Sequence, residues 1–322
     1  MWRRALAAVS LFFLSPLVAE YLLGSLPLTM IWLLPIMALM YGSGAVLIRE
    51  ALRRSGRSWL TLILLAMAYG FVEEGLVTQS LFNPNYLHLR LLDYGYLSWL
   101  GTGAPWLVYV IGLHVFWSIS VPIALTESLF VEDREKPWLH WAGIALFALL
   151  FVGGAALIGF FTYKQAPFMA SPVQLGASVT VVIALIVAAF GLPKRPMPKP
   201  GDAPHPLIIF AVVLICGSGF VGAEMWAPQW RLPWPAALAL MLGFVGAALA
   251  FVLGFTNGRA WSNLQRFALM AGGLGVYIWL GVILDRQLHP TDSTIAHAIL
   301  IAFFLALCAI AALRARKPNP RA

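Results

Sequence analysis

The amino-acid sequence predicts an all-α protein that forms a polytopic bundle of about ten transmembrane helices. Of its 322 residues, 61% are hydrophobic and only 11% are charged, whereas a soluble domain carries about 25% charged residues. The apolar residues form runs of about 20, the length that an α-helix needs to cross the hydrocarbon core. The basic residues lie in short segments between these runs, a pattern typical of polytopic membrane proteins. The chain is therefore an integral membrane protein, and the lipid bilayer is its first expected partner.

The predicted spans follow one another closely along the chain. They cover residues 5–23, 29–48, 58–79, 104–128, 139–163, 171–192, 206–227, 233–255, 263–284 and 293–313. The first run follows Met-Trp-Arg-Arg and lacks a clear small-residue cleavage site before Tyr21. We therefore interpret it as a retained span rather than a secretory signal peptide.

The longest predicted outer segment is 80–103. Its Asn83-Pro84 pair favours a turn. The Tyr, Leu and Trp residues that follow are typical of an amphipathic segment at the membrane interface.

A single transmembrane domain is expected for residues 1–322. Spans one to six fill 1–192, a Pro-rich cytoplasmic linker fills 193–205, and spans seven to ten fill 206–322. Val18-Ala-Glu20 resembles Gly222-Ala-Glu224. Such similarities indicate either a degenerate parallel repeat, with spans 1–4 related to spans 7–10, or the chance likeness of apolar helices.

The basic residues predict the orientation. With the N-terminus in the cytoplasm, all but four of the 21 lysines and arginines lie on the inner side. The exceptions fall singly in four outer loops and are Arg90, Lys164, Arg231 and Arg286. We therefore expect both termini to be inside and the membrane to be a bacterial cytoplasmic membrane.

Several functional classes are excluded by composition and motif. The formal charge of +8 does not predict a nucleic-acid partner, because the basic residues are dispersed among the loops. Cys216 and Cys308 both lie in apolar runs, which argues against a disulfide framework or a cysteine metal cluster. The sequence has no Walker loop, dinucleotide fingerprint or His-Glu-x-x-His metalloprotease motif.

Ionisable residues within the spans are the candidates for function. An acidic residue at the middle of a membrane helix costs roughly 2.5–3.5 kcal/mol, so it usually marks a site. The adjacent pair Glu73 and Glu74 lies in the outer half of span three, and His114 lies ten residues into span four. We therefore predict that Glu73, Glu74 and His114 are catalytic. A divalent metal such as zinc is the cofactor that this residue set could hold, and a Glu could act as general base.

Other polar residues are predicted to support this site. Thr78 shares a helix face with Glu74, and Ser118 shares one with His114. Glu20 and Glu224 lie near the outer ends of spans one and seven and are expected to be supporting or structural. Glu127 is expected at the inner interface.

A Glu-Glu pair in one membrane helix and a His in the next resembles the CPBP family, also called Abi or CAAX-prenyl protease type II. In that family the motifs are Glu-Glu-x-x-x-Arg, Phe-x-x-x-His and a later His-x-x-x-Asn or Asp. The resemblance implies that Glu73 activates a water and that His114 helps to hold the site. Here Thr78 stands at the Arg position and Val110 at the Phe position, and neither His289 nor His297 begins the third motif.

Three functions remain open on the sequence. The first is a CPBP-like intramembrane peptidase, or an inactive relative of one, that acts on a membrane-embedded peptide. The second is a proton-coupled secondary transporter of a small molecule, which ten spans and buried acids would suit. The third is a non-enzymatic membrane assembly factor whose acids fix helix packing.

Overall fold

The computed structural model describes residues 2–194, 204–256, 261–290 and 294–316. Helices and strands follow in the order α1 Trp2–Pro16, η1 Leu17–Leu22, η2 Leu28–Leu33, α2 Leu34–Ser55, α3 Trp59–Phe71, η3 Val72–Val77, η4 Tyr86–His88, β1 Tyr96–Leu97, β2 Thr102–Gly103, α4 Ala104–Leu113, η5 His114–Ser120, α5 Val121–Leu129, η6 Val131–Asp133, α6 Trp141–Gln165, α7 Pro172–Gly191, α8 Pro206–Trp226, α9 Trp234–Thr256, α10 Asn263–Leu288 and α11 Thr294–Ala315. The segments η1, η3 and η5 are π-helical, and η2, η4 and η6 are 3₁₀ turns.

The predicted helical bundle is confirmed. Within the described ranges, ten helices are long and apolar enough to cross a membrane, and each coincides with one predicted span. The predicted linker 193–205 lies mostly outside the described residues.

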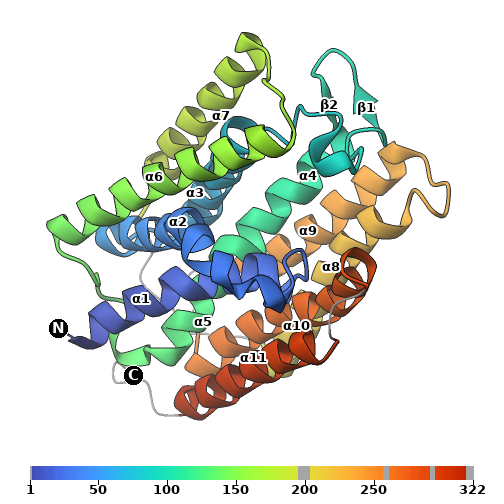
Figure 1. Ribbon diagram of the computed structural model, residues 1–322. Helices are drawn as coiled ribbons and strands as arrows, with labels where there is room; N and C mark the ends of the chain where they lie inside the picture. The colour runs from blue at the N-terminus through green and yellow to red at the C-terminus, as the bar shows by residue number, and fades with distance from the viewer. Residues whose placement is uncertain (1, 195–203, 257–260, 291–293, 317–322) are drawn as a thin grey trace.

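The helices run side by side, with the start of α1 and the end of α11 at the same end of the bundle (Figure 1). Helix α2 packs between α1 and α6, α3 packs against α7, and α8 packs against α9 and α10. The span formed by α4, η5 and α5 is the most enclosed, with 67% of its most apolar stretch buried, against 11% for α7 and α9. This fourth span is therefore the centre of the bundle, while α7 and α9 present their apolar surfaces to lipid.

The centre is built around aromatic packing. Trp117 of η5 stacks on Tyr277 of α10 at 4.8 Å between ring centroids, and the two planes differ by 6°. The indole N–H of Trp117 donates a hydrogen bond of 2.8 Å to the Gly273 carbonyl. This contact satisfies the polar edge of a buried ring, so it fixes α10 against the span that carries His114.

Helix α2 is longer than predicted, ending at Ser55 instead of near residue 48. The prediction ended the span at its first charged residues, but these are buried. Arg49 is fully buried, donating to Glu127 at 3.1 Å and to Glu50 at 2.9 Å. Arg53 also pairs with Glu127. We call Arg49, Glu50, Arg53 and Glu127 the Arg49 network, and it places Glu127 in a buried ion-pair cluster near the end of the fourth span.

The outer segment 80–103 has turns around the Asn83-Pro84 pair and little regular structure. It contains the 3₁₀ turn η4 and a short antiparallel pairing of β1 with β2, with Tyr96 opposite Gly103. Leu87, His88 and Arg90 have positive φ angles, which a continuous amphipathic helix does not allow. The turn chemistry therefore dominates over the apolar pattern in this segment.

Candidate functional site

Three of the first four spans change from α-helix to π-helix at the point where they carry an ionisable residue. Glu20 lies in η1, Glu73 and Glu74 lie in η3, and His114 begins η5. A π-helical segment inserts extra backbone into a turn and is frequently found at functional sites. Among the described residues, the π-helical segments are confined to these three places.

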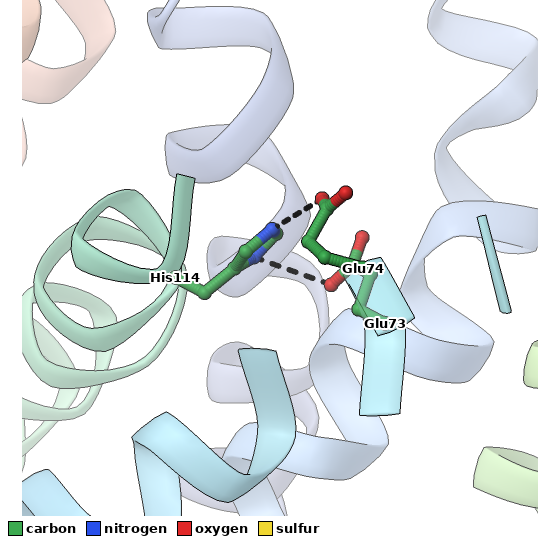
Figure 2. Close-up of side chains that lie close together, drawn as sticks. All are labelled: Glu73, Glu74 and His114. Atoms are coloured by element: carbon green, nitrogen blue, oxygen red, sulfur yellow. Dashed lines mark hydrogen bonds and ion pairs between the residues drawn. The ribbon is translucent and has the colours of Figure 1, made fainter. Parts of the chain in front are cut away.

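The carboxylates of the pair face His114 from two sides (Figure 2). The Nε2 atom of His114 lies 2.7 Å from Glu74 Oε1, and its Nδ1 atom lies 3.2 Å from Glu73 Oε2. The Ser118 hydroxyl lies 3.1 Å from the same Nδ1 atom. The proximity expected from the sequence is therefore seen in the structure, and the widened turn of η3 lets two adjacent residues reach one imidazole.

The two carboxylates differ in how completely they are bound. Glu74 Oε2 accepts hydrogen bonds from the hydroxyls of Thr78, at 3.0 Å, and Ser80, while its Oε1 contacts His114. The Trp106 indole donates to Ser80 at 3.3 Å and holds that hydroxyl in place. Glu73 is only 2% exposed, and its Oε2 has no well-aligned hydrogen bond within the described part of the chain. Glu74 is therefore fixed, and Glu73 is the carboxylate that is free to act.

Glu20 approaches the same site from the first span. Its carboxylate accepts hydrogen bonds from Ser25, at 2.6 Å, and from the Tyr41 hydroxyl. The Tyr41 ring lies 6.1 Å from the His114 ring, and the Tyr69 ring lies 5.9 Å from it. Two tyrosines therefore line the space between Glu20 and His114.

The electrostatic balance of the site is unusual. Glu20, Glu73 and Glu74 are gathered around one histidine, and no lysine or arginine in the described ranges forms an ion pair with any of them. Three buried carboxylates cannot all stay ionised beside a single imidazolium without a large desolvation cost. The site must therefore hold protons or a cation.

The predicted site residues do not all meet. Glu224 lies on α8 with one buried carboxylate oxygen that has no hydrogen-bond partner within the described residues, and none of the interactions of Glu73, Glu74 or His114 found there involves it. Depth alone placed Glu224 beside the others in the sequence prediction, but α8 packs on a different side of the fourth span.

The sequence analysis missed four residues that contribute to the site. They are Tyr41, Tyr69, Ser80 and Tyr86. Burial first, and then the nearby carboxylates, raises the pKa of the Tyr86 phenol above its ordinary value, so this outer side chain stays neutral over the site. The sequence feature that could have predicted these four residues is a hydroxyl side chain within or next to an apolar span.

A metal ion is compatible with the donor set. The donor atoms of Glu73, Glu74 and His114 all lie within 4.8 Å of one another. Carboxylate oxygens and imidazole nitrogens both ligate zinc, and catalytic zinc sites use three protein ligands and leave a fourth position for water. The short contact between Glu74 and His114 is a hydrogen bond as it stands, so a cation would replace it.

A groove reaches the site from the side of α6. It has a volume of about 450 Å³ and is lined by Thr78, Gln79 and Asn83 after η3, and by Gly159 and Tyr163 of α6. Thr78 is also a hydrogen-bond donor to Glu74. The groove therefore ends one side chain away from the carboxylate pair.

The comparisons with known proteins assign no chemistry. The sequence model of an uncharacterized membrane protein family matches residues 9–321. No curated protein and no solved structure matches the chain.

Proposed function

The chain belongs to this uncharacterized membrane protein family, and we propose that it is an intramembrane peptidase that resembles the CPBP enzymes. The observation that carries the proposal is the contact of Glu73 and Glu74 with opposite nitrogens of His114, 3.2 and 2.7 Å away, in buried π-helical segments. Two carboxylates on one imidazole are expensive to bury for packing alone.

The proposal gives each residue a separate role. Glu73 is the general base, because its Oε2 lacks a fixed hydrogen-bond donor. It takes a proton from a water as the water oxygen attacks the carbonyl carbon of a peptide bond, and it passes that proton to the leaving nitrogen as the C–N bond breaks. Glu74, held by Thr78 and Ser80, orients His114. Where a divalent cation is bound, Glu73, Glu74 and His114 would hold it, and it would supply Lewis-acid polarisation of the carbonyl.

The departures from the CPBP motifs have a local explanation. Thr78, at the family's Arg position, donates a hydrogen bond to Glu74 instead of neutralising its charge. In place of a later His-x-x-x-Asn helix, Glu20 and Tyr41 from the first two spans border the site. His297, one candidate for that motif, lies 3.9 Å from Asp285 of α10 instead. We therefore propose a CPBP-like site with a different set of supporting residues.

The substrate proposed is a membrane-embedded peptide. The groove beside Thr78 and Gln79 lies between the segment after η3 and α6. An extended peptide needs its backbone hydrogen bonds satisfied in the bilayer. The side-chain oxygens of Gln79 and Asn83 accept from the Ala170 and Asn85 backbone N–H groups, which leaves their amide N–H groups to donate to peptide carbonyls along this groove.

One observation favours a second candidate, a proton-coupled carrier. Glu20, Tyr41, Glu73 and His114 form a continuous row of titratable groups across the first four spans. Rows of this kind carry protons in pumps and transporters. A non-enzymatic assembly factor is the third candidate, and it would need the carboxylates only for packing.

The test is Glu73→Gln, with Glu224→Gln as the matched control. Both replace a carboxylate of a membrane helix by an amide of the same shape, but only Glu73 contacts His114. We expect Glu73→Gln to lower cleavage of a membrane-peptide library by about 10²-fold or more, with an unchanged folded yield. Glu224→Gln should retain activity.

The other outcomes separate the candidates. The carrier would be established by two results together. Glu73→Gln would lose proton-driven uptake in vesicles but keep substrate exchange, and the unmodified chain would cleave no peptide. Full function of Glu73→Gln, Glu74→Gln and the double variant would refute any role of the pair as a site.

We also propose that both termini face the cytoplasm of a bacterial cell. The basic residues near the chain ends support this orientation. In a background of Cys216→Ser and Cys308→Ser, a cysteine in place of Tyr94 should react with a membrane-impermeant thiol reagent in intact cells. A cysteine in place of Lys136 should not react, and its labelling from outside would reverse the orientation.

A further inference from the structure

Two adjoining hollows lie away from the Glu/His site, between α3, α5, α9 and α10. The first lies at the end of the bundle that holds the start of α1 and the end of α11, and its charged lining residues are Arg53, Arg57, Glu127, Arg134 and Arg266. The second, of about 120 Å³, lies deeper among Phe116, Trp117 and Phe244 and is lined almost wholly by apolar side chains. Trp59, Ala124 and Leu269 line both. Together they form one amphipathic groove.

Among the arginines that line the groove's outer part, Arg57 is the one without a carboxylate partner within the described residues. Arg53 is already paired with Glu127 and Glu135, at 3.0 Å for the latter, and belongs to the Arg49 network. Arg57 donates to the Leu192 carbonyl and lies 5.7 Å from the Phe190 ring. No carboxylate within the described residues forms an ion pair with Arg57, and its Nε is buried without a hydrogen-bond partner. This donor is therefore available to an anion.

The apolar part distinguishes a lipid from a free anion. A phosphate alone would use only the arginine end, whereas the deeper hollow continues into the hydrocarbon region along η5 and α9. Trp59 and Trp261 line the charged hollow, and tryptophan is enriched at the level of lipid headgroups. Basic pockets between transmembrane helices are suited to anionic headgroups.

We propose that this groove binds one anionic phospholipid. Its phosphate lies at Arg57, and the same hollow is lined by Arg134 and Arg266, which share the carboxylate of Glu135 at 3.6 and 3.9 Å. One of its acyl chains enters the hollow between η5, α8 and α9. The proposal is independent of the peptidase function, because the groove lies on the opposite side of η5 from Glu73 and Glu74.

The test uses the full chain purified in neutral detergent. A fluorescent phosphatidylglycerol and a phosphatidylcholine with the same chains are titrated separately. We expect phosphatidylglycerol to bind at least tenfold more tightly. Arg57→Gln should weaken it by about fivefold, which corresponds to one arginine near a lipid phosphate. The matched control is Arg54→Gln, because Arg54 lies shortly before Arg57, in the last turn of α2, but pairs with Glu50 and lies 5.1 Å from Trp141, outside the groove.

A second pair of variants tests the apolar half. Ala248 lines the deeper hollow, whereas Ala247 of the same helix is exposed. Ala248→Phe should reduce phosphatidylglycerol binding by fivefold or more while Ala247→Phe leaves it unchanged, with gel filtration confirming that both variants are folded. Equal affinity for the two lipids, or equal losses in Arg57→Gln and Arg54→Gln, would overturn the proposal. Displacement of the lipid by equimolar inorganic phosphate would also overturn it, in favour of a free-anion site.

Discussion

The molecule contains two buried clusters of charged residues, and they are balanced in opposite ways. In the Arg49 network, Glu127 accepts from both Arg49 and Arg53, and Glu50 accepts from Arg49 and from the Trp138 backbone N–H. In the Glu/His site, the carboxylates face one imidazole and hydroxyl groups. Similar burial therefore serves two purposes, because the first cluster is neutralised by arginine and the second is not.

The difference between the two clusters distinguishes buried charges that stabilise the fold from buried charges that can form a site. Arg49 also donates to the Lys136 and Arg134 carbonyls and lies 3.5 Å from the Trp138 ring. Every polar group of this network has a partner within the chain, so nothing more is needed to hold it. The Glu/His site has an oxygen without a well-aligned partner, which leaves room for a water, a proton or a cation.

The largest effect is expected for Arg49→Met. It removes the cation from a fully buried position and leaves Glu50 and Glu127 with incomplete partners. Breaking a buried pair in this way costs about 3–5 kcal/mol, so the thermal midpoint in detergent should fall sharply or folded protein should be lost. Arg3→Gln, whose ion pair with Glu132 is exposed and lies outside the network, is the control. A midpoint of Arg49→Met equal to that of the control would show that the network is not structural.

The second effect is expected for Ser80→Ala. The Ser80 hydroxyl donates to the buried Glu74 carboxylate, and a hydrogen bond to a charged group contributes about 1.5–3 kcal/mol. We expect a smaller fall in the midpoint than for Arg49→Met, and, under the proposed peptidase function, a loss of cleavage because Glu74 no longer fixes His114.

Ser120→Ala is the matched control for this variant. Ser120 is buried in η5 but donates to the Val115 carbonyl of its own segment. If both alanine variants lose activity equally, the effect belongs to packing of η5 and not to the carboxylate.

Much of this arrangement follows from patterns that the sequence displays. Hydropathy and length predict all ten spans, because the bilayer imposes them on each helix separately. Glu73, Glu74 and His114 lie on consecutive spans at similar depth, which predicts their proximity. Two features required the folded structure. The π-helical turns depend on hydrogen-bond register, which apolar spacing does not encode, and the distance of Glu224 from the cluster depends on which helices pack together.

The third variant, Glu73→Gln, compares the two clusters directly. It should leave stability unchanged or raise it, whereas Arg49→Met should lower it. Glu73→Gln replaces a buried carboxylate by an amide, which costs less to desolvate. We expect the midpoint of Glu73→Gln to be unchanged or raised, by up to about 1 kcal/mol in stability, although the proposed peptidase function predicts that cleavage is lost. Denaturation of both variants in the same detergent measures this difference. A fall as large as that of Arg49→Met would assign both clusters to structure.

The smallest effect is expected for Arg3→Gln, which removes an exposed ion pair near the start of α1. Arg3 contacts Glu132 at 2.7 Å, but the two side chains are 43% and 50% exposed. A backbone N–H hydrogen bond, together with Arg3, lowers the pKa of Glu132 below its ordinary value of 4.5. The contribution of Glu132 to stability is therefore present above pH 4.5 and is lost as the pH falls through the lowered pKa. Exposed pairs contribute about 0–1 kcal/mol, so Arg3→Gln should change the midpoint at pH 7 only slightly, and the difference should vanish in acid and in high salt. A loss at pH 7 comparable to that of Arg49→Met would show that exposure does not separate the structural ion pairs from the rest.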